Sequence, residues 1–202
     1  MFQALSDLKN YLQADLCKFK DSWPFRPQFW KSLLHPRFLP VLLFRLAGFF
    51  HALNWGLPSK LSALSNQILF GCDIARGAQI QGGLFLPHPN GVVVGEYVRI
   101  GKNCILHQGV TLGTRGQEHE IDNPQIGHEV EIATGAKILG GVVLGDYARI
   151  GANAVVLGDV PAYGVAVGIP ARVVRLRPEA PSAPERAEEE KEVQKQWALL
   201  EP

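Results

Sequence analysis

An aliphatic residue recurs at every sixth position through most of the segment from Gly71 to Leu157 of this 202-residue chain. The repeated positions are Ile74, Ile80, Leu86, Val94, Ile100, Leu106, Leu112, Ile126, Ile132, Ile138, Leu144, Ile150 and Val156. A period of six fits neither a helix nor an ordinary strand. It is typical of a parallel β-helix, in which each hexapeptide forms one short side of a triangular coil. Glycine follows many of these residues, and we expect it to let the backbone turn the corner.

Two insertions interrupt the period. The first separates Leu86 from Val94 and contains His88 between two prolines, and the second separates Leu112 from Ile126. In a solenoid, insertions become loops on the surface, often on the binding face. We therefore expect the chemistry of this protein in these two loops.

The bulk properties exclude several classes of protein. A net charge of +1 and a pI near 7.8 give no electrostatic case for nucleic-acid binding. The three cysteines, Cys17, Cys72 and Cys104, are odd in number and have no paired spacing. Free thiols indicate a reducing compartment, and the acidic N-terminal segment does not have the pattern of a signal peptide. These features predict a cytoplasmic location.

Helical patterns precede the repeats. Residues 1–20 form an amphipathic pattern, residues 28–34 predict a short helix, and residues 59–70 predict a helix that leads into the first coil. Residues 38–57 are the most apolar stretch, but Pro40, Arg45, His51 and Asn54 interrupt it. We expect this helix to pack on other helices or subunits. A peripheral membrane contact through its aromatic end is the alternative, and a membrane span is the least favoured.

Three segments resemble the serine O-acetyltransferase branch of the hexapeptide-repeat acyltransferases. They are LPHPNGVVVGEYVRIGKNCILHQGVTLG, IATGAKILGGVVLGDYARIGANAVVLGDVP and GIPARVV, and the likeness runs from about Phe38 to Val174. The last segment resembles the tail signature of these acyltransferases, and the pattern from His88 to Glu96 resembles this particular branch. The resemblance implies a left-handed parallel β-helix preceded by helices, a homotrimer or a dimer of trimers, and acetyl-CoA bound between two β-helices.

The expected domains follow from the repeats and the resemblance. Residues 1–70 form an α-helical domain and residues 71–176 form the left-handed β-helix acyltransferase domain. Residues 177–202 form a linker and a tail, for which both a terminal helix and disorder remain open. The fold class is therefore mostly β, with an N-terminal helical part.

The resemblance also implies a catalytic pair. The catalytic base of the family matches His88, and its partner aspartate matches Asp73. Fifteen residues is close to one coil, so the two side chains should lie on neighbouring turns. His88 would take the proton of an acceptor hydroxyl as that hydroxyl attacks the thioester of acetyl-CoA. Asp73 would orient the imidazole and stabilise the imidazolium.

By the same resemblance, acetyl-CoA is the co-substrate and no metal is needed. The positions that match its contacts are Gly113, Thr134, Arg149 and Ala152, with Arg172 near the phosphates. Ordinary corner residues of a solenoid are the alternative interpretation of these positions.

The departures from the family concern the acceptor. Pro87 stands where an aspartate is usual, and Asp122 and Asn123 replace an Arg-His pair before Pro124. A carboxylate in place of an arginine would repel the carboxylate of serine. We therefore expect a sugar or polysaccharide-precursor hydroxyl as the acceptor, with serine as the alternative. Candidate acceptor-binding residues are Arg115, His119, Asp122 and Asn123.

Other classes and partners are less favoured. Zinc β-helix enzymes use two histidines five residues apart, and no pair among His88, His107, His119 and His128 has that spacing. A non-catalytic hexapeptide scaffold is the non-enzyme alternative, and the presence of both His88 and Asp73 argues against it. The chain does not end in the isoleucine that docks into cysteine synthase in the family, so no such complex is expected.

Overall fold

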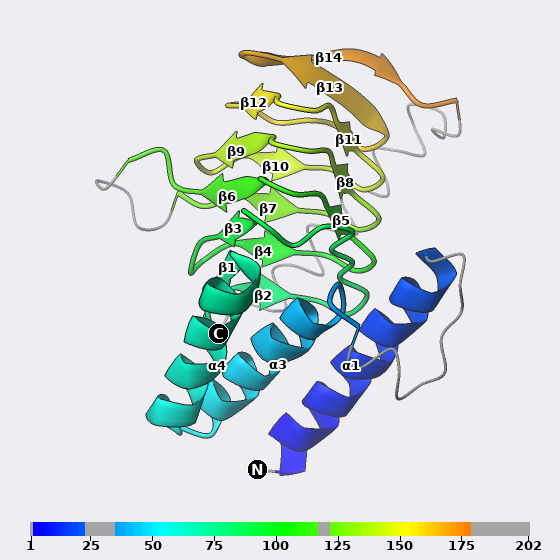
Figure 1. Cartoon of the computed structure of the whole chain (residues 1–202). Coiled ribbons are helices and arrows are strands. Elements are labelled where there is room, and N and C mark those ends of the chain that lie inside the picture. The colour runs from blue at the N-terminus through cyan, green and yellow to red at the C-terminus, as the bar shows by residue number, and fades with distance from the viewer. Residues whose placement is uncertain (1, 23–34, 117–121, 179–202) are drawn as a thin grey trace.

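A computed structural model describes residues 2–22, 35–116 and 122–178. Three helices come first: α1 (Phe2–Ser22), α3 (Leu39–Ala52) and α4 (Gly56–Phe70). A stack of short strands follows, and Figure 1 shows the helices at the foot of this stack. The helix α4 ends at Phe70 and is capped by Gly71, whose left-handed φ of 58° suits glycine, and the first strand begins two residues after Gly71.

The strands form three faces of a triangular coil. Face A contains β1 (Asp73–Ile74), β3 (Val93–Val94), β6 (Thr111–Gly113), β9 (Lys137–Leu139) and β12 (Val155–Val156). Face B contains β2 (Gln79–Ile80), β4 (Arg99–Ile100), β7 (Gln125–Ile126) and β10 (Val143–Leu144). Face C contains β5 (Ile105–Leu106), β8 (Glu131–Ile132), β11 (Arg149–Ile150), β13 (Gly164–Gly168) and β14 (Ala171–Leu176). Neighbouring strands are parallel except for the β13–β14 hairpin, which closes the coil at the end far from the helices (Figure 1).

The repeat prediction is confirmed at every position. All of the aliphatic residues that define the period are at most 5% exposed and belong to one core cluster. Each stacks on its equivalent one coil away, as Ile100 does on Ile126. Each hexapeptide therefore gives one buried aliphatic strand residue, and a smaller residue two positions before it, such as Val98 or Val130, is buried as well.

The expected role of the glycines was wrong. Those that follow an aliphatic residue do not have positive φ angles; the left-handed residue comes two positions later in the turn, as at Asn103. Gly101 is instead needed for space, because a Cβ there would lie 2.6 Å from the backbone of Gly127 in the next coil. Close approach of successive coils, rather than a special dihedral, explains these glycines.

The helices form a small base with its own core. The helix α3 lies between α1 and α4 (Figure 1), as its apolar sequence predicted. Leu16 and Phe19 of α1 pack with Phe38 and Phe85, which joins the base to the coil. Among the helices within the described ranges, none is long and apolar enough to cross a membrane.

A buried ion pair also joins the base to the coil. Asp15 of α1 is fully buried and pairs with Arg45 of α3, whose Nε lies 2.8 Å from Oδ2. The Oδ1 atom accepts hydrogen bonds from the backbone N–H groups of Gly83 and Leu84. Arg45 donates to the carbonyl groups of Ile80 and Gln81. Both charges are therefore fully hydrogen-bonded, as burial requires.

Some predicted features lie outside the described residues. These are the short helix at 28–34, His119 in the second insertion, and all of the tail from residue 179.

Candidate active site

The first insertion lies at the corner where face C passes into face A. Turns from successive coils stack along this corner and are joined by backbone hydrogen bonds of 2.8–3.0 Å. The bonds run from Gly91 N to Gly71 O, from Gly109 N to Asn90 O, from Gly135 N to Gln108 O and from Asn153 N to Thr134 O. This column, which we call the C–A edge, brings together the His88 turn, Thr134 and the turn at Ala152.

His88 and Asp73 both lie at the C–A edge. His88 is exposed between two half-buried prolines, and Asp73 is exposed at the start of β1. The backbone N–H of Asp73 donates to Val92 O at 2.9 Å, and Asp73 pairs with Val93, five residues after His88. No side-chain hydrogen bond between the two is present within the described part of the chain. The catalytic pair therefore remains a prediction, supported by two exposed side chains on adjacent coils.

The buried ion pair fixes the segment that leads to His88. Gly83 and Leu84, which donate to Asp15 at 2.7 and 2.9 Å, precede His88 by five and four residues. Sequence reasoning missed Asp15. Its only signal in the sequence is a polar residue on the apolar side of a helix, and this signal indicates a buried ion pair only when the partner residues are already known.

Other predicted residues lie at the opposite edge of face A, where the second insertion begins. A Cβ on Gly113 would have no neighbour within 4 Å among the described residues, so the space above it is open. Arg115 donates from Nη2 to Leu157 O at 2.7 Å, Asp122 accepts from Gly141 N, and Asn123 is buried. The predicted acceptor side chains that are described are therefore held largely by the protein itself.

A cavity of about 490 Å³ opens at this second edge, which we call the A–B edge. Arg115 and Arg172 line it together with Leu157, Gly158 and Asp159. Two guanidinium groups at one cavity suit an anionic group such as a phosphate. Arg172 is exposed, and its Nη1 donates to the neighbouring Ala171 O at 3.0 Å.

The two edges are separated by the width of face A, about 10–15 Å at ~3.3 Å per residue. His88, Asp73, Thr134 and Ala152 lie on one edge, whereas Gly113 lies at the other. Arg172 pairs with Val167 in the closing hairpin above the coil. One chain alone therefore does not bring all of the predicted site residues together.

Arg149 is at neither edge, but on the outer side of face C. Its Nε lies 3.1 Å from Glu131 Oε2, and its Nη1 donates to Glu129 O at 2.6 Å. Glu131 also contacts His107 Nε2 at 3.2 Å. The guanidinium of Arg149 is thus engaged within the chain, and cofactor contact by this residue remains a prediction.

Lys137 is a cation that sequence reasoning did not single out. It lies on the outer side of face A, in the same row as Asp73, Val93 and Thr111. Its Nζ donates to Gly109 O at 2.6 Å and to Thr111 Oγ1 at 3.0 Å. A lysine at an outward strand position is ordinarily a solvated residue, so the sequence carried no signal for it.

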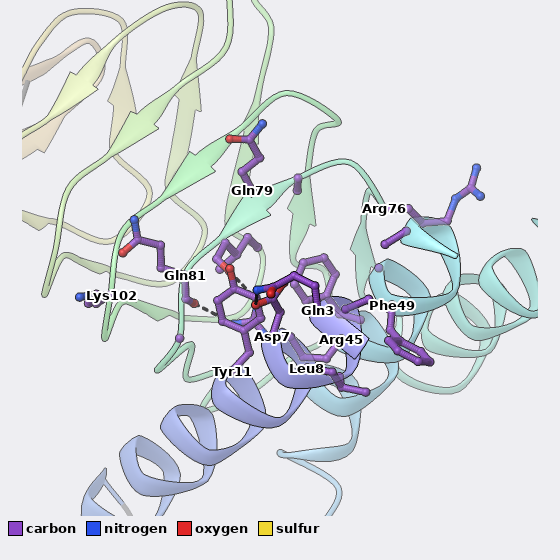
Figure 2. A pocket seen from close by; sticks show the side chains of 17 residues that line it. Gln3, Asp7, Leu8, Tyr11, Arg45, Phe49, Arg76, Gln79, Gln81 and Lys102 are labelled. Carbon is purple, nitrogen blue, oxygen red and sulfur yellow. Dashed lines mark hydrogen bonds between the residues drawn. The ribbon is translucent and has the colours of Figure 1, made fainter. Parts of the chain in front are cut away.

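The larger cavity, of about 900 Å³, lies elsewhere, between α1, α3 and the first coils. Figure 2 shows Asp7 and Tyr11 of α1 beside Arg45 in this cavity. None of the predicted site residues lines it. No cluster of three or more histidine, cysteine, aspartate or glutamate side chains in the described segments could hold a metal ion.

Comparison with known proteins agrees with this architecture. Residues 123–158 match the family model "Bacterial transferase hexapeptide (six repeats)". A serine acetyltransferase of Staphylococcus xylosus is 45% identical over 117 residues, which are 58% of this chain and 54% of that protein. One of Synechococcus elongatus is 37% identical over 142 residues, 70% of this chain and 58% of that protein. This chain therefore spans just over half the length of these relatives.

Solved structures cover more of both chains. The serine acetyltransferase of Neisseria gonorrhoeae superposes with a TM-score of 0.81 at 32% identity, over 91% of this chain and 72% of that one. The enzyme of Brucella abortus in complex with coenzyme A gives a TM-score of 0.79 at 31% identity, over 86% and 70% of the two chains.

The three-sided coil and its matches define a hexapeptide-repeat transferase with a left-handed parallel β-helix. Within that class, the chain belongs to the family of serine acetyltransferase-like proteins.

Proposed function

We propose that this protein is an acetyl-CoA-dependent O-acetyltransferase with His88 as its general base. The observation that carries the proposal is the exposed His88 turn at the C–A edge, with Asp73 exposed on the adjacent coil. The family membership supports it, since the Brucella abortus relative was solved with coenzyme A.

In the proposed reaction, the acceptor hydroxyl attacks the carbonyl carbon of the thioester. His88 takes the hydroxyl proton as the new C–O bond forms, and a tetrahedral oxyanion results. When the C–S bond breaks, the imidazolium returns the proton to the CoA thiolate. Asp73 keeps the imidazole oriented and stabilises its positive charge. Protein groups at the open surface above Gly113 and at the Thr134 and Ala152 turns would bind the cofactor.

The proposed site forms between copies of the chain, as in a homotrimer. The support is the distribution of the predicted residues over both edges of face A. The C–A edge of one copy beside the A–B edge of the next would place His88 opposite Gly113 and Arg115. The two arginines that line the cavity, Arg115 and Arg172, would then face the phosphates of CoA.

L-serine is the acceptor that the comparisons favour, because the relatives named above are serine acetyltransferases. The expected preference for a sugar has no support from them. One observation still favours a sugar hydroxyl as a second candidate: Asp122 lies where the family has an arginine, and its carboxylate is bound to Gly141 N. A serine site here would need a different cation for the substrate carboxylate.

The test is a kinetic assay that follows loss of the acetyl-CoA thioester. L-serine and a panel of sugars and glycosides are compared with the wild-type chain, His88→Ala, and His51→Ala as a matched control on α3. We expect turnover with L-serine, a loss of about 10²–10⁴-fold in kcat for His88→Ala, and no change for His51→Ala.

The acceptor that supports turnover decides between L-serine and a sugar as the substrate. Turnover on a sugar without turnover on serine would replace serine by the second candidate. Full activity of His88→Ala, or no turnover with any acceptor, would contradict the proposed function and favour a scaffold.

A further inference from the structure

The ammonium group of Lys137 carries a positive charge that no carboxylate within the described part of the chain neutralises. Its Nζ is held by two neutral acceptors, Gly109 O at 2.6 Å and Thr111 Oγ1 at 3.0 Å. The side chain is half-buried on the outer side of face A. An ammonium group has three N–H donors, so one N–H remains for a further acceptor. The cation is therefore fixed in position and can still bind an anion.

The ammonium group lies beside the His88 turn. Its acceptor Gly109 belongs to the C–A edge, where Gly109 N donates to Asn90 O at 3.0 Å, and Asn90 follows His88 by two residues. A Cβ on Gly91 would lie 3.3 Å from Gly109 Cα, so the two turns are in close contact. Lys137 thus extends from β9 back to the turn that stacks on the His88 turn.

Three groups consequently follow one another along the C–A edge. Gly91, in the His88 turn, donates to Gly71 O at 2.8 Å, and Asp73 follows Gly71 by two residues. Asp73 is therefore one coil from the His88 turn on one side, and the Lys137 ammonium is one coil from it on the other. Successive coils are about 4.8 Å apart. The edge presents an acid, a base and a cation in that order.

We propose that the Lys137 ammonium binds the carboxylate of L-serine and thereby selects this acceptor. The inference rests on the proposed function and names a specificity-determining residue for it. A serine site in this chain needs a cation that the second insertion does not supply, because Asp122 lies where the family has an arginine and is bound to Gly141 N. Lys137 supplies that cation from face A.

The dimensions of serine fit this arrangement. A general base takes the hydroxyl proton at about 3 Å, and an ammonium binds a carboxylate oxygen at about 2.7–2.9 Å. Two carbon atoms separate the hydroxyl oxygen from the carboxylate carbon, a span of about 3–4 Å with bonds of ~1.5 Å. Base and cation should therefore be about 6–10 Å apart. Side chains from turns one coil apart, at ~4.8 Å, can reach this separation.

Other cations of the coil are less suited to the role. Arg149 is on face C and forms an ion pair with Glu131 at 3.1 Å. Arg115 and Arg172 line the cavity at the far edge of face A, where two guanidinium groups suit a phosphate. A single ammonium group next to the proposed base suits the single charge of a carboxylate.

The test compares two acceptors that differ in the carboxylate alone. L-serinamide keeps the hydroxyl and amino groups of L-serine but has an uncharged amide in place of the carboxylate. Lys137→Met removes the charge at nearly the same length, and Lys137→Arg retains it. Lys102→Met is the matched control, because Lys102 is an exposed lysine of another turn of the coil. The ratio of kcat/KM for the two acceptors is taken within each variant, so it does not depend on the folded fraction.

We expect Lys137→Met to lower kcat/KM for L-serine by about 10–100-fold, since a hydrogen bond to a charged group is lost. The loss should appear chiefly in KM for L-serine. The constants for L-serinamide and KM for acetyl-CoA should not change, so the preference for L-serine disappears. Lys137→Arg should keep the preference, and Lys102→Met should behave as the wild type. Calorimetric titration of L-serine without acetyl-CoA should show the same rise in Kd for Lys137→Met.

Several results would overturn the inference. An unchanged ratio of the two acceptors in Lys137→Met would do so and leave the proposed function intact. An equal loss of kcat on both acceptors would assign the cation to the oxyanion, and a raised KM for acetyl-CoA would assign it to the cofactor. A wild-type chain that turns over no acceptor would contradict the proposed function. The titration then decides the inference separately: no binding of L-serine, or equal binding by the wild type and Lys137→Met, would refute it.

Discussion

The coil and the base of this molecule are stabilised in different ways. The core of the coil is a continuous cluster of apolar side chains, stacked from one turn to the next. The junction between base and coil instead contains a buried ion pair between residues 30 positions apart, which also binds backbone groups up to 69 positions away. A core built by repetition is encoded locally, whereas the junction depends on contacts that no local pattern encodes.

The largest effect should come from the junction. Asp15→Ala leaves the Arg45 guanidinium buried without its carboxylate and removes the acceptor of two backbone N–H groups. We expect a loss of about 3–5 kcal/mol in the free energy of unfolding. Urea denaturation at one fixed protein concentration measures it.

A second ion pair across the same junction provides the control. Lys18 lies 3.1 Å from Glu129, but both side chains are partly exposed. Lys18→Ala should therefore lower the free energy of unfolding by no more than about 1 kcal/mol. Equal losses for Asp15→Ala and Lys18→Ala would mean that burial does not distinguish the two pairs.

A somewhat smaller effect is expected within the coil. Ile132 is fully buried between its equivalents in the adjacent coils, Leu106 and Ile150. Ile132→Ala should cost about 2–5 kcal/mol and Ile132→Val about 0.5–1.5 kcal/mol. The outward Val143→Ala should stay within about 0.5 kcal/mol. If the inward and outward variants cost the same in thermal or urea unfolding, repetition is not what stabilises the coil.

The smallest effect concerns the thiols of the coil. Burial raises the pKa of Cys72 to about 12 and that of Cys104 to about 12. Both thiols therefore stay protonated in the folded chain, while those of the unfolded chain ionise above their ordinary pKa of 9.0. Stability should fall as the pH rises above 9, by up to about 1.4 kcal/mol per thiol per pH unit.

Two measurements address this prediction. At pH 8 a thiol reagent should modify only the exposed Cys17 in the folded protein, and all three cysteines in urea. Replacing Cys72 and Cys104 by alanine should reduce the pH slope between 9 and 10. An unchanged slope would mean that other ionisable groups cause the fall in stability with pH.

Much of the fold could be predicted from the sequence, but less of the site could. The repeat located the buried aliphatic residues of the strands but not those of the turns, such as Val98 and Val130. The apolar stretch at 38–57 correctly predicted a helix packed on other helices, although this helix ends at Ala52. The pairing of His88 with Asp73 was inferred from their spacing and from a resemblance, and it remains a prediction. Arg149 illustrates what sequence position alone does not predict. Its position suggested cofactor contact, but the coil places Glu131 beside it, and the two side chains form an ion pair.

The sequence alone determined the β-helix of this protein, because an aliphatic residue at every sixth position fits neither a helix nor an ordinary strand. Only the tertiary structure showed that the predicted site residues divide between two edges of face A, and that the Lys137 ammonium lies at the turn next to the His88 turn. Both depend on the direction in which each side chain leaves the folded backbone. That direction is set by packing between segments distant in the sequence, so local periodicity does not contain it.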